Sequence, residues 1–160
     1  MQVLSLWNGP GTVKVTFLDS NGDPASEDLV EEVQTHIDPE PQQEGNGRAP
    51  IGALVTVTTA STKTVDVSAK VSLGVAGDIE KVEEDFSAAL DTYFREIGYD
   101  EKTKSVSVAK IGNILFDVPG IVDYDATSLR VNGGTAAVSI DKEEVLRAGT
   151  VTLTTGGGVA

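Results

Sequence analysis

The chain has 160 residues and a formal net charge of −13, from 25 acidic and 12 basic side chains. This negative charge repels phosphate backbones, so the composition argues against nucleic acid as a partner. The chain has no cysteine, which excludes disulfides and thiolate metal sites. No run of about 18 apolar residues occurs, so we expect no membrane span.

The N-terminal part of the chain predicts a strand followed by a helix. Residues 12–18 alternate and are β-branched, which is typical of a strand. Ser26 is a natural N-cap for a helix over 26–37, which should end before Pro39. Residues 38–50 are polar and rich in Pro and Gly. We interpret them as a surface loop within one domain, with an interdomain linker as the alternative.

The middle of the chain predicts two strands and the main helix. Residues 53–59 and 64–73 read as strands, and their short connection favours an antiparallel pair. The second strand alternates apolar and polar residues, so one of its faces should be buried and the other exposed. Apolar side chains at helical spacing predict a helix over 78–97, with Gly98 just after its end.

The elements expected after Gly98 are short. They are a strand at 106–108, a helix at 111–118, a hairpin formed by 121–131 and 135–140, a strand at 151–153 and a mobile glycine-rich tail at 155–160.

Two Asn-Gly pairs, Asn8-Gly9 and Asn132-Gly133, lie between apolar runs near the two ends of the chain. Asn-Gly is a strong hairpin signal because both residues tolerate positive φ. We therefore expect matching hairpins there. Because Met1 stands immediately before the first hairpin, we also expect the chain to be a fragment of a longer protein.

The strands and main helices follow the order β-α-β-β-α-β, which is the split, ferredoxin-like α+β arrangement. It places both helices on one face of an antiparallel sheet. We expect a single α+β domain over 1–154, followed by the flexible tail at 155–160.

The chemistry-bearing residues favour structural interpretations. Residues 19–23 (DSNGD) lack the glycine and glutamate positions of a calcium loop and indicate a turn. His36, the only histidine, has no evident catalytic partner in the sequence. The acidic run at 80–85 is expected to be a solvated helix face. For Trp7, packing on its own hairpin and contact with a partner both stay open. We therefore predict no catalytic, cofactor-binding or metal-binding residue.

Four segments of the chain form a recognisable series. They are 7–15 (WNGPGTVKV), 49–57 (APIGALVTV), 118–124 (VPGIVDY) and 131–133 (VNG). In this order they resemble the C-terminal half of the baseplate J-like proteins, which are structural proteins of contractile phage tails and of phage-derived tail particles. The likeness runs from about residue 7 to residue 154 and is greatest to forms from prophages of Gram-positive bacteria.

The resemblance implies a non-enzymatic component of the baseplate wedge, located in the virion tail and assembled in the bacterial cytoplasm. Its implied partners are other baseplate and tail proteins and, within the baseplate ring, further copies of itself, but neither nucleic acid nor membrane. We expect contacts at the exposed face of strand 64–73, the loop 38–50 and the hairpin tips. The alternative is a small-molecule-binding regulatory domain of ferredoxin-like type.

Overall fold

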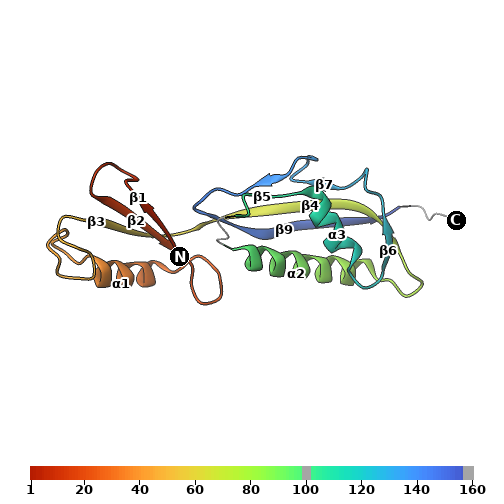
Figure 1. Ribbon diagram of the computed structural model, residues 1–160. Helices are drawn as coiled ribbons and strands as arrows, with labels where there is room; N and C mark the ends of the chain where they lie inside the picture. Colours follow the sequence, from red (N-terminus) through yellow and green to blue (C-terminus); the bar gives the residue numbers. More distant parts are fainter. Residues whose placement is uncertain (99–101, 157–160) are drawn as a thin grey trace. The chain divides into compact units, whose positions relative to one another are not determined.

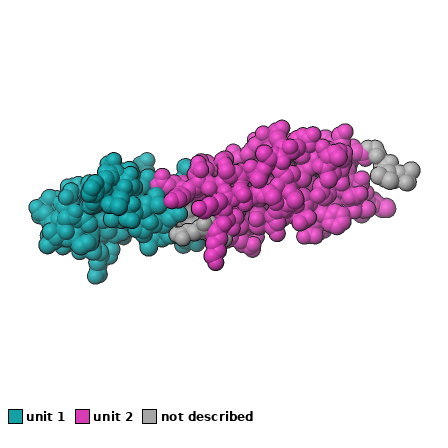
Figure 2. Space-filling view, turned by 45° about the horizontal axis from the view of Figure 1, so that its top comes forward, with its two compact units in different colours: residues 1–61 teal, residues 62–160 magenta. Residues whose placement is uncertain are grey.

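The computed structural model describes residues 1–98 and 102–156, and the chain divides into two compact units, 1–61 and 62–160 (Figure 2). Each unit has a hydrophobic cluster of its own, around Val15, Val55 and Val57 in unit 1 and around Phe86 and Leu90 in unit 2. The sequence predicts a single domain over 1–154 instead. No turn or polar linker marks the junction, which falls between Ser61 and Thr62, at the start of the strand Ser61–Leu73.

Unit 1 contains a three-stranded sheet with one helix on it (Figure 1). Its strands are β1 (Gln2–Ser5), β2 (Thr12–Phe17) and β3 (Leu54–Thr59), in the order β1-β2-β3. β1 is antiparallel and β3 is parallel to β2. Helix α1 (Glu27–Ile37) lies in the long crossover that a parallel pair requires.

The predicted limits of α1 are confirmed. The Ser26 side chain accepts a hydrogen bond from the Leu29 N–H at 3.3 Å, and the helix ends at Asp38, before Pro39. The side chains of Val30, Val33 and Ile37 pack against the core cluster, but no residue of α1 is fully buried. The helix therefore covers the sheet incompletely.

Unit 2 is built around the long strand β4 (Ser61–Leu73). β4 pairs with β6 (Ile121–Tyr124) and β7 (Arg130–Val131), both antiparallel, and with β9 (Glu144–Thr155). Helix α2 (Ile79–Ile97) packs against β9. The alternation predicted for this part of the chain is confirmed, since Val65, Val67, Ala69 and Val71 are buried between polar neighbours.

The helix predicted over 78–97 is confirmed, both in its limits and in the apolar face that it buries. Val82, Phe86, Leu90 and Phe94 form its buried stripe, Asp78 is its N-cap and Gly98 its C-cap. The remaining elements are short. They are β5 (Ser105–Val106), helix α3 (Val108–Phe116), which the Ser107 side chain caps, and β8 (Val138–Ser139), which pairs with β5.

The chain has the mixed α+β character predicted, but the ferredoxin-like order in one sheet is not confirmed. β2 and β3 pair with each other in parallel, whereas β4 belongs to another sheet. Only Ala60 separates β3 from β4. A hairpin needs a loop of at least about two residues, so β4 cannot fold back on β3 as the sequence suggested.

The first Asn-Gly pair lies in a real hairpin but does not form its turn. β1 and β2 pair in register, and the connection between them is residues 6–11. The positive φ angles fall at Leu6 (59°), Gly9 (107°) and Gly11 (77°), not at Asn8. A two-residue Asn-Gly turn would need positive φ at both residues. The connection is therefore a longer loop that uses other residues.

The second Asn-Gly pair forms the turn but not the hairpin. Asn132 and Gly133 have φ of 50° and 76°, and Val131 and Gly134 exchange two backbone hydrogen bonds of 2.9 and 3.0 Å. The flanking strands then part, because β7 pairs with β4 and β8 with β5. The Asn132 N–H donates to the Asp66 carbonyl at 2.8 Å, and its side-chain oxygen accepts from the Asp66 N–H at 2.9 Å. Asn132 thus fastens the turn to β4.

The C-terminal strand is longer than predicted. The expected strand at 151–153 is part of β9, and Thr155 belongs to this strand rather than to a tail. The Gly156 N–H donates to the Val71 carbonyl at 3.2 Å. Residues 157–160 of the expected tail lie outside the described residues.

Helix α3 packs closely because it contains Gly112. This residue is buried, and a Cβ added there would collide with the hydroxyl oxygen of Tyr124 on β6. We expect Gly112→Ala to lower the free energy of unfolding by about 1–3 kcal/mol through overpacking. Urea unfolding checks this.

The matched control is Gly134→Ala, where an added Cβ would be 3.8 Å from its nearest neighbour, the Val131 carbonyl oxygen. The Y124F substitution should restore part of the loss in Gly112→Ala. Equal stability of the two alanine variants would contradict the proposed close contact.

Candidate interaction surfaces

The outer edge of β3 is closed by side chains. The Val55 N–H donates to Asp38 Oδ2 at 3.0 Å, and the Val57 N–H donates to Gln34 Oε1 at 2.8 Å. The Val55 carbonyl accepts from the amide groups of Gln34 and Gln42, at 3.0 and 3.2 Å. Satisfied in this way, these backbone groups cannot pair with a further strand.

Asp38 also fixes the loop 38–50, one of the contact surfaces predicted from the sequence. Its side chain is buried, and its Oδ1 accepts from the Gln43 N–H at 3.1 Å. The Ile37 carbonyl accepts from the N–H groups of Arg48 and Ala49. The loop is therefore fastened to unit 1 and is not a linker between the two units.

The edge of β9 in unit 2 is closed in the same manner, by carboxylates of α2. Glu83 accepts a hydrogen bond from the Leu153 N–H at 2.6 Å, and Asp91 accepts one from the Ala148 N–H at 3.2 Å. The acidic run was expected to be a solvated face. That is correct for Glu80 and Glu84, which are exposed, but not for Glu83. Its strand partner lies about 70 residues away, which the sequence does not reveal.

The edge of β1 has no such closure among the described residues, where β2 is its one paired strand. The Leu6 N–H donates to the Thr12 carbonyl at 2.8 Å. In an antiparallel pair, every second residue forms backbone hydrogen bonds to the neighbouring strand. Because Leu6 does so, the register makes Leu4 and Gln2 the other residues whose backbone groups face β2. The backbone groups of Val3 and Ser5 therefore point outward.

The tip of the first hairpin carries Trp7, whose side chain is 43% exposed. The ammonium group of Lys14, on the paired strand, lies 5.0 Å from the centroid of the indole ring. This cation–π contact supports packing of Trp7 on its own hairpin. The exposed part of the ring is still available to a partner.

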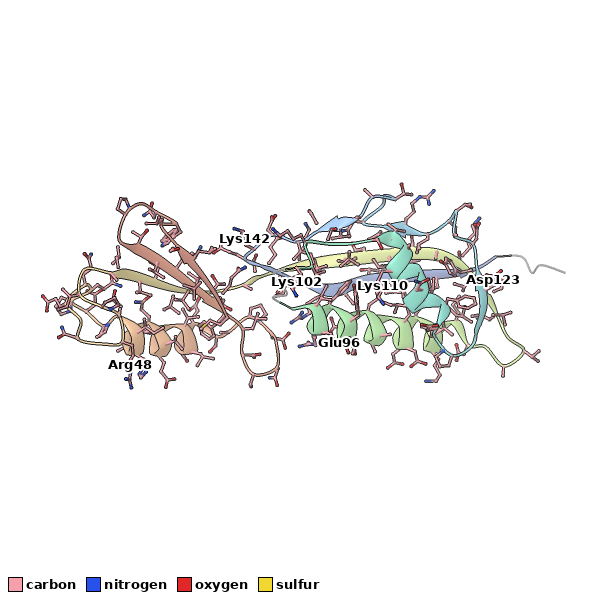
Figure 3. All side chains as sticks on the ribbon, viewed as in Figure 1. Arg48, Glu96, Lys102, Lys110, Asp123 and Lys142 are labelled. Carbon is pink, nitrogen blue, oxygen red and sulfur yellow. The ribbon has the colours of Figure 1, made fainter. Side chains whose placement is uncertain are left out.

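The polar face of β4 borders a shallow groove of about 410 Å³, lined by Lys70, Ser72, Tyr124 and Asp125 among others. Figure 3 shows Asp123, on β6, which also lines it. Hydrogen bonds from the Thr127 side chain and backbone lower the pKa of Asp125. The exposed face predicted for this strand is thus present and carries both signs of charge.

Two large apolar side chains of unit 2, Phe116 and Val122, are 52% and 62% exposed. The Phe116 ring packs edge-on against Tyr124 with centroids 6.5 Å apart.

The metal-like segment 19–23 forms a turn, and the single histidine lies on the surface. Asp19 Oδ1 accepts from the N–H groups of Asn21 and Asp23, so 19–23 is a side-chain-stabilised turn. His36 is exposed in the last turn of α1. Across 1–98 and 102–156 no group of three His, Cys, Asp or Glu side chains could hold a metal ion. Within the same residues no helix has the length and hydropathy needed to cross a membrane.

Both units match models of one protein family. The baseplate J-like central domain matches residues 1–59, and the baseplate J-like protein C-terminal domain matches residues 65–154. The chain belongs to the baseplate J-like family. The resemblance drawn from the four sequence segments is therefore confirmed, and the two family domains correspond to units 1 and 2.

Two similar proteins come from Bacillus subtilis (strain 168). The phage-like element PBSX protein XkdT is 33% identical over 94% of this chain, and the uncharacterized protein YqbT is 35% identical over 96% of it. The chain spans 42% of the length of each of these relatives.

The fold is similar to that of a chain in the six-fold symmetrised cryo-EM structure of the anti-feeding prophage baseplate. The TM-score is 0.51 at 13% sequence identity, over 86% of this chain and 29% of that chain. At this identity the likeness establishes the fold.

We expect Asp38→Ala to destabilise unit 1 by about 2–4 kcal/mol, because two backbone N–H groups lose their acceptor in a buried site. Thermal unfolding and hydrogen exchange at the Val55 amide measure the effect. Glu32→Ala, at an exposed position of α1, is the control and should change stability by less than about 0.5 kcal/mol. Unchanged protection of Val55 would show that the carboxylate does not close the edge.

For unit 2 the matched pair is Glu83→Ala and Glu84→Ala. We expect the first to cost about 1–2 kcal/mol, since it leaves the Leu153 N–H without its acceptor, and the second to be nearly neutral. Urea unfolding together with exchange at the Leu153 amide measures both. Equal effects of the two substitutions would contradict the closure of β9 by Glu83.

Proposed function

We propose that the chain is a structural part of the baseplate of a phage or prophage contractile tail and acts in assembly of the baseplate wedge. The observation that carries this proposal is the match of both units, in order, to the two baseplate J-like domains. Similarity to a protein of a phage-like element and to a chain from a prophage baseplate supports it.

The proposed role is mechanical and non-enzymatic. Each unit has its own core and a sheet edge closed by side chains, which suits a module that must keep its shape under load. Many copies in one particle make individually weak contacts strong through effective concentration. The proposal needs no catalytic, cofactor or metal residue.

The proposed partners are other baseplate and tail proteins and further copies of the chain around the ring, without nucleic acid or membrane. The proposed location is the virion tail baseplate, after assembly in the host cytoplasm. Candidate contact surfaces are the polar face of β4, the loop 38–50 and the exposed part of Trp7. The alternative role as a ferredoxin-like regulatory domain loses its basis, because β2 and β3 do not share a sheet with β4.

The test is deletion of the gene segment that encodes this chain in a host that produces the particles. Electron microscopy should show tails without complete baseplates, and the wild-type segment supplied in trans as part of the full gene should restore them. A full gene carrying Gly134→Ala is the matched control and should also restore them. Normal baseplates after deletion, or a saturable thermal shift of the chain with a metabolite, would overturn the proposal.

A further inference from the structure

We propose that the outer flank of α1 binds a basic amphipathic helix of another baseplate protein. This inference rests on the proposed function, because it assumes that the chain works among other baseplate proteins. The observations behind it are a half-covered sheet face, an apolar groove along α1 and an acidic rim on the same helix.

The face of the sheet that carries α1 is only partly covered. Val3 pairs with Val15 across β1 and β2, and directly paired residues point to the same face. Val15 is buried in the cluster that includes α1, whereas Val3 is 55% exposed. α1 therefore shields this face near β2 and β3 but leaves it open at β1.

α1 has one apolar side chain, Leu29, that does not pack against the core of its own unit, and others that pack there but stay partly exposed. Leu29 is half-buried but is not among the side chains packed against the core cluster. Val33 and Ile37 follow it at intervals of four residues and are also half-buried. These three positions form a stripe along one flank of the helix. Gln34, which closes β3, lies on the other flank.

A groove of about 770 Å³ follows this stripe, and one side of it is acidic. The carboxylates of Glu31 and Glu32 are exposed. They lie after the first turn of α1, so the helix dipole, which favours acidic residues in the first turn, does not explain their presence. The groove is lined by Asp28, Leu29, Glu31, Glu32, Val33, Thr35, His36 and Ile37.

The charge of unit 1 selects the chemistry of the partner. Unit 1 contains one lysine, Lys14, and one arginine, Arg48. Lys14 lies over the Trp7 ring. The Arg48 N–H donates to the Ile37 carbonyl at the end of α1, and Figure 3 shows the Arg48 side chain beside this helix. Neither residue lines the groove. The acidic residues of unit 1 outnumber these two basic ones, and they are Asp19, Asp23, Glu27, Asp28, Glu31, Glu32, Asp38, Glu40 and Glu44.

An amphipathic helix with leucines on one face and lysines or arginines beside them fits these features. Its apolar face would cover Leu29 and Val33, and its cations would reach Glu31 and Glu32. A second copy of this chain fits less well, because the same acidic helices would face each other. Charge complementarity therefore favours a different, basic protein.

The first experiment uses two 18-residue helical peptides, one of leucine and lysine and one with glutamate in place of lysine. Fluorescence anisotropy measures their binding to the 160-residue chain. The buffer contains about 0.15 M salt, which screens interactions between distant charges. We expect the lysine peptide to bind and the glutamate peptide not to bind. Leu29→Ser and Glu32→Lys should each weaken the lysine peptide about tenfold, a loss of about 1.4 kcal/mol.

The matched controls are Val122→Ser and Glu84→Lys, which change an exposed apolar residue and an exposed carboxylate of unit 2. They should leave the affinity unchanged, and circular dichroism verifies that all four variants are folded. No binding, equal binding of both peptides, or equal losses in the controls would overturn the inference. None of these results depends on whether the chain is needed for tail assembly.

The second experiment places a photo-crosslinking amino acid at position 29 of the full-length protein in assembled particles, with position 122 as the control site. We expect a cross-linked peptide from another baseplate protein with Lys or Arg at helical spacing. Cross-links to a second copy or to another part of the same chain would overturn the inference. Whether assembly of the particles requires this segment is a separate question, which the deletion test answers.

Discussion

Closure of sheet edges by side chains is the constraint on which both units depend. In unit 1, Gln34 and Asp38 satisfy the backbone of β3. In unit 2, Glu83 and Asp91 do so for β9. Most of these side chains belong to the helix that also packs on the sheet through its apolar stripe. Each helix is therefore held to its strand by polar and apolar contacts together, which fixes where it lies and blocks addition of a further strand.

The two units differ in how completely the helix covers its sheet. α2 buries four large side chains and is a full partner of its core, whereas α1 buries none completely. Unit 1 thus keeps an open edge at β1 and a partly exposed apolar flank on α1. A monomeric protein would have to cover such apolar surfaces and strand edges itself. In a multi-subunit particle, neighbouring chains can cover them instead.

Local features of the chain could be predicted well. The Ser26 side chain caps the start of α1, and Gly98, which has no side chain, ends α2. The alternation of apolar and polar residues over 64–73 identified the buried face of that strand. Strand pairing could not be predicted, because partners such as β4 and β7 are chosen by packing between segments distant in sequence. The Asn-Gly pairs show the limit clearly. Asn132 and Gly133 form the expected turn, but tertiary bonds to Asp66 decide what lies beyond it.

The sequence by itself determined the α+β character and the two main helices, which follow from short-range periodicity. Its composition excluded cysteine chemistry, and the resemblance of four segments indicated the family. Only the tertiary structure decided that there are two cores, that β2 pairs with β3, and that Asp38 and Glu83 close strand edges. The reason is physical. A carboxylate on a helix looks the same in sequence whether it faces water or a backbone N–H, and only the fold brings that N–H within reach.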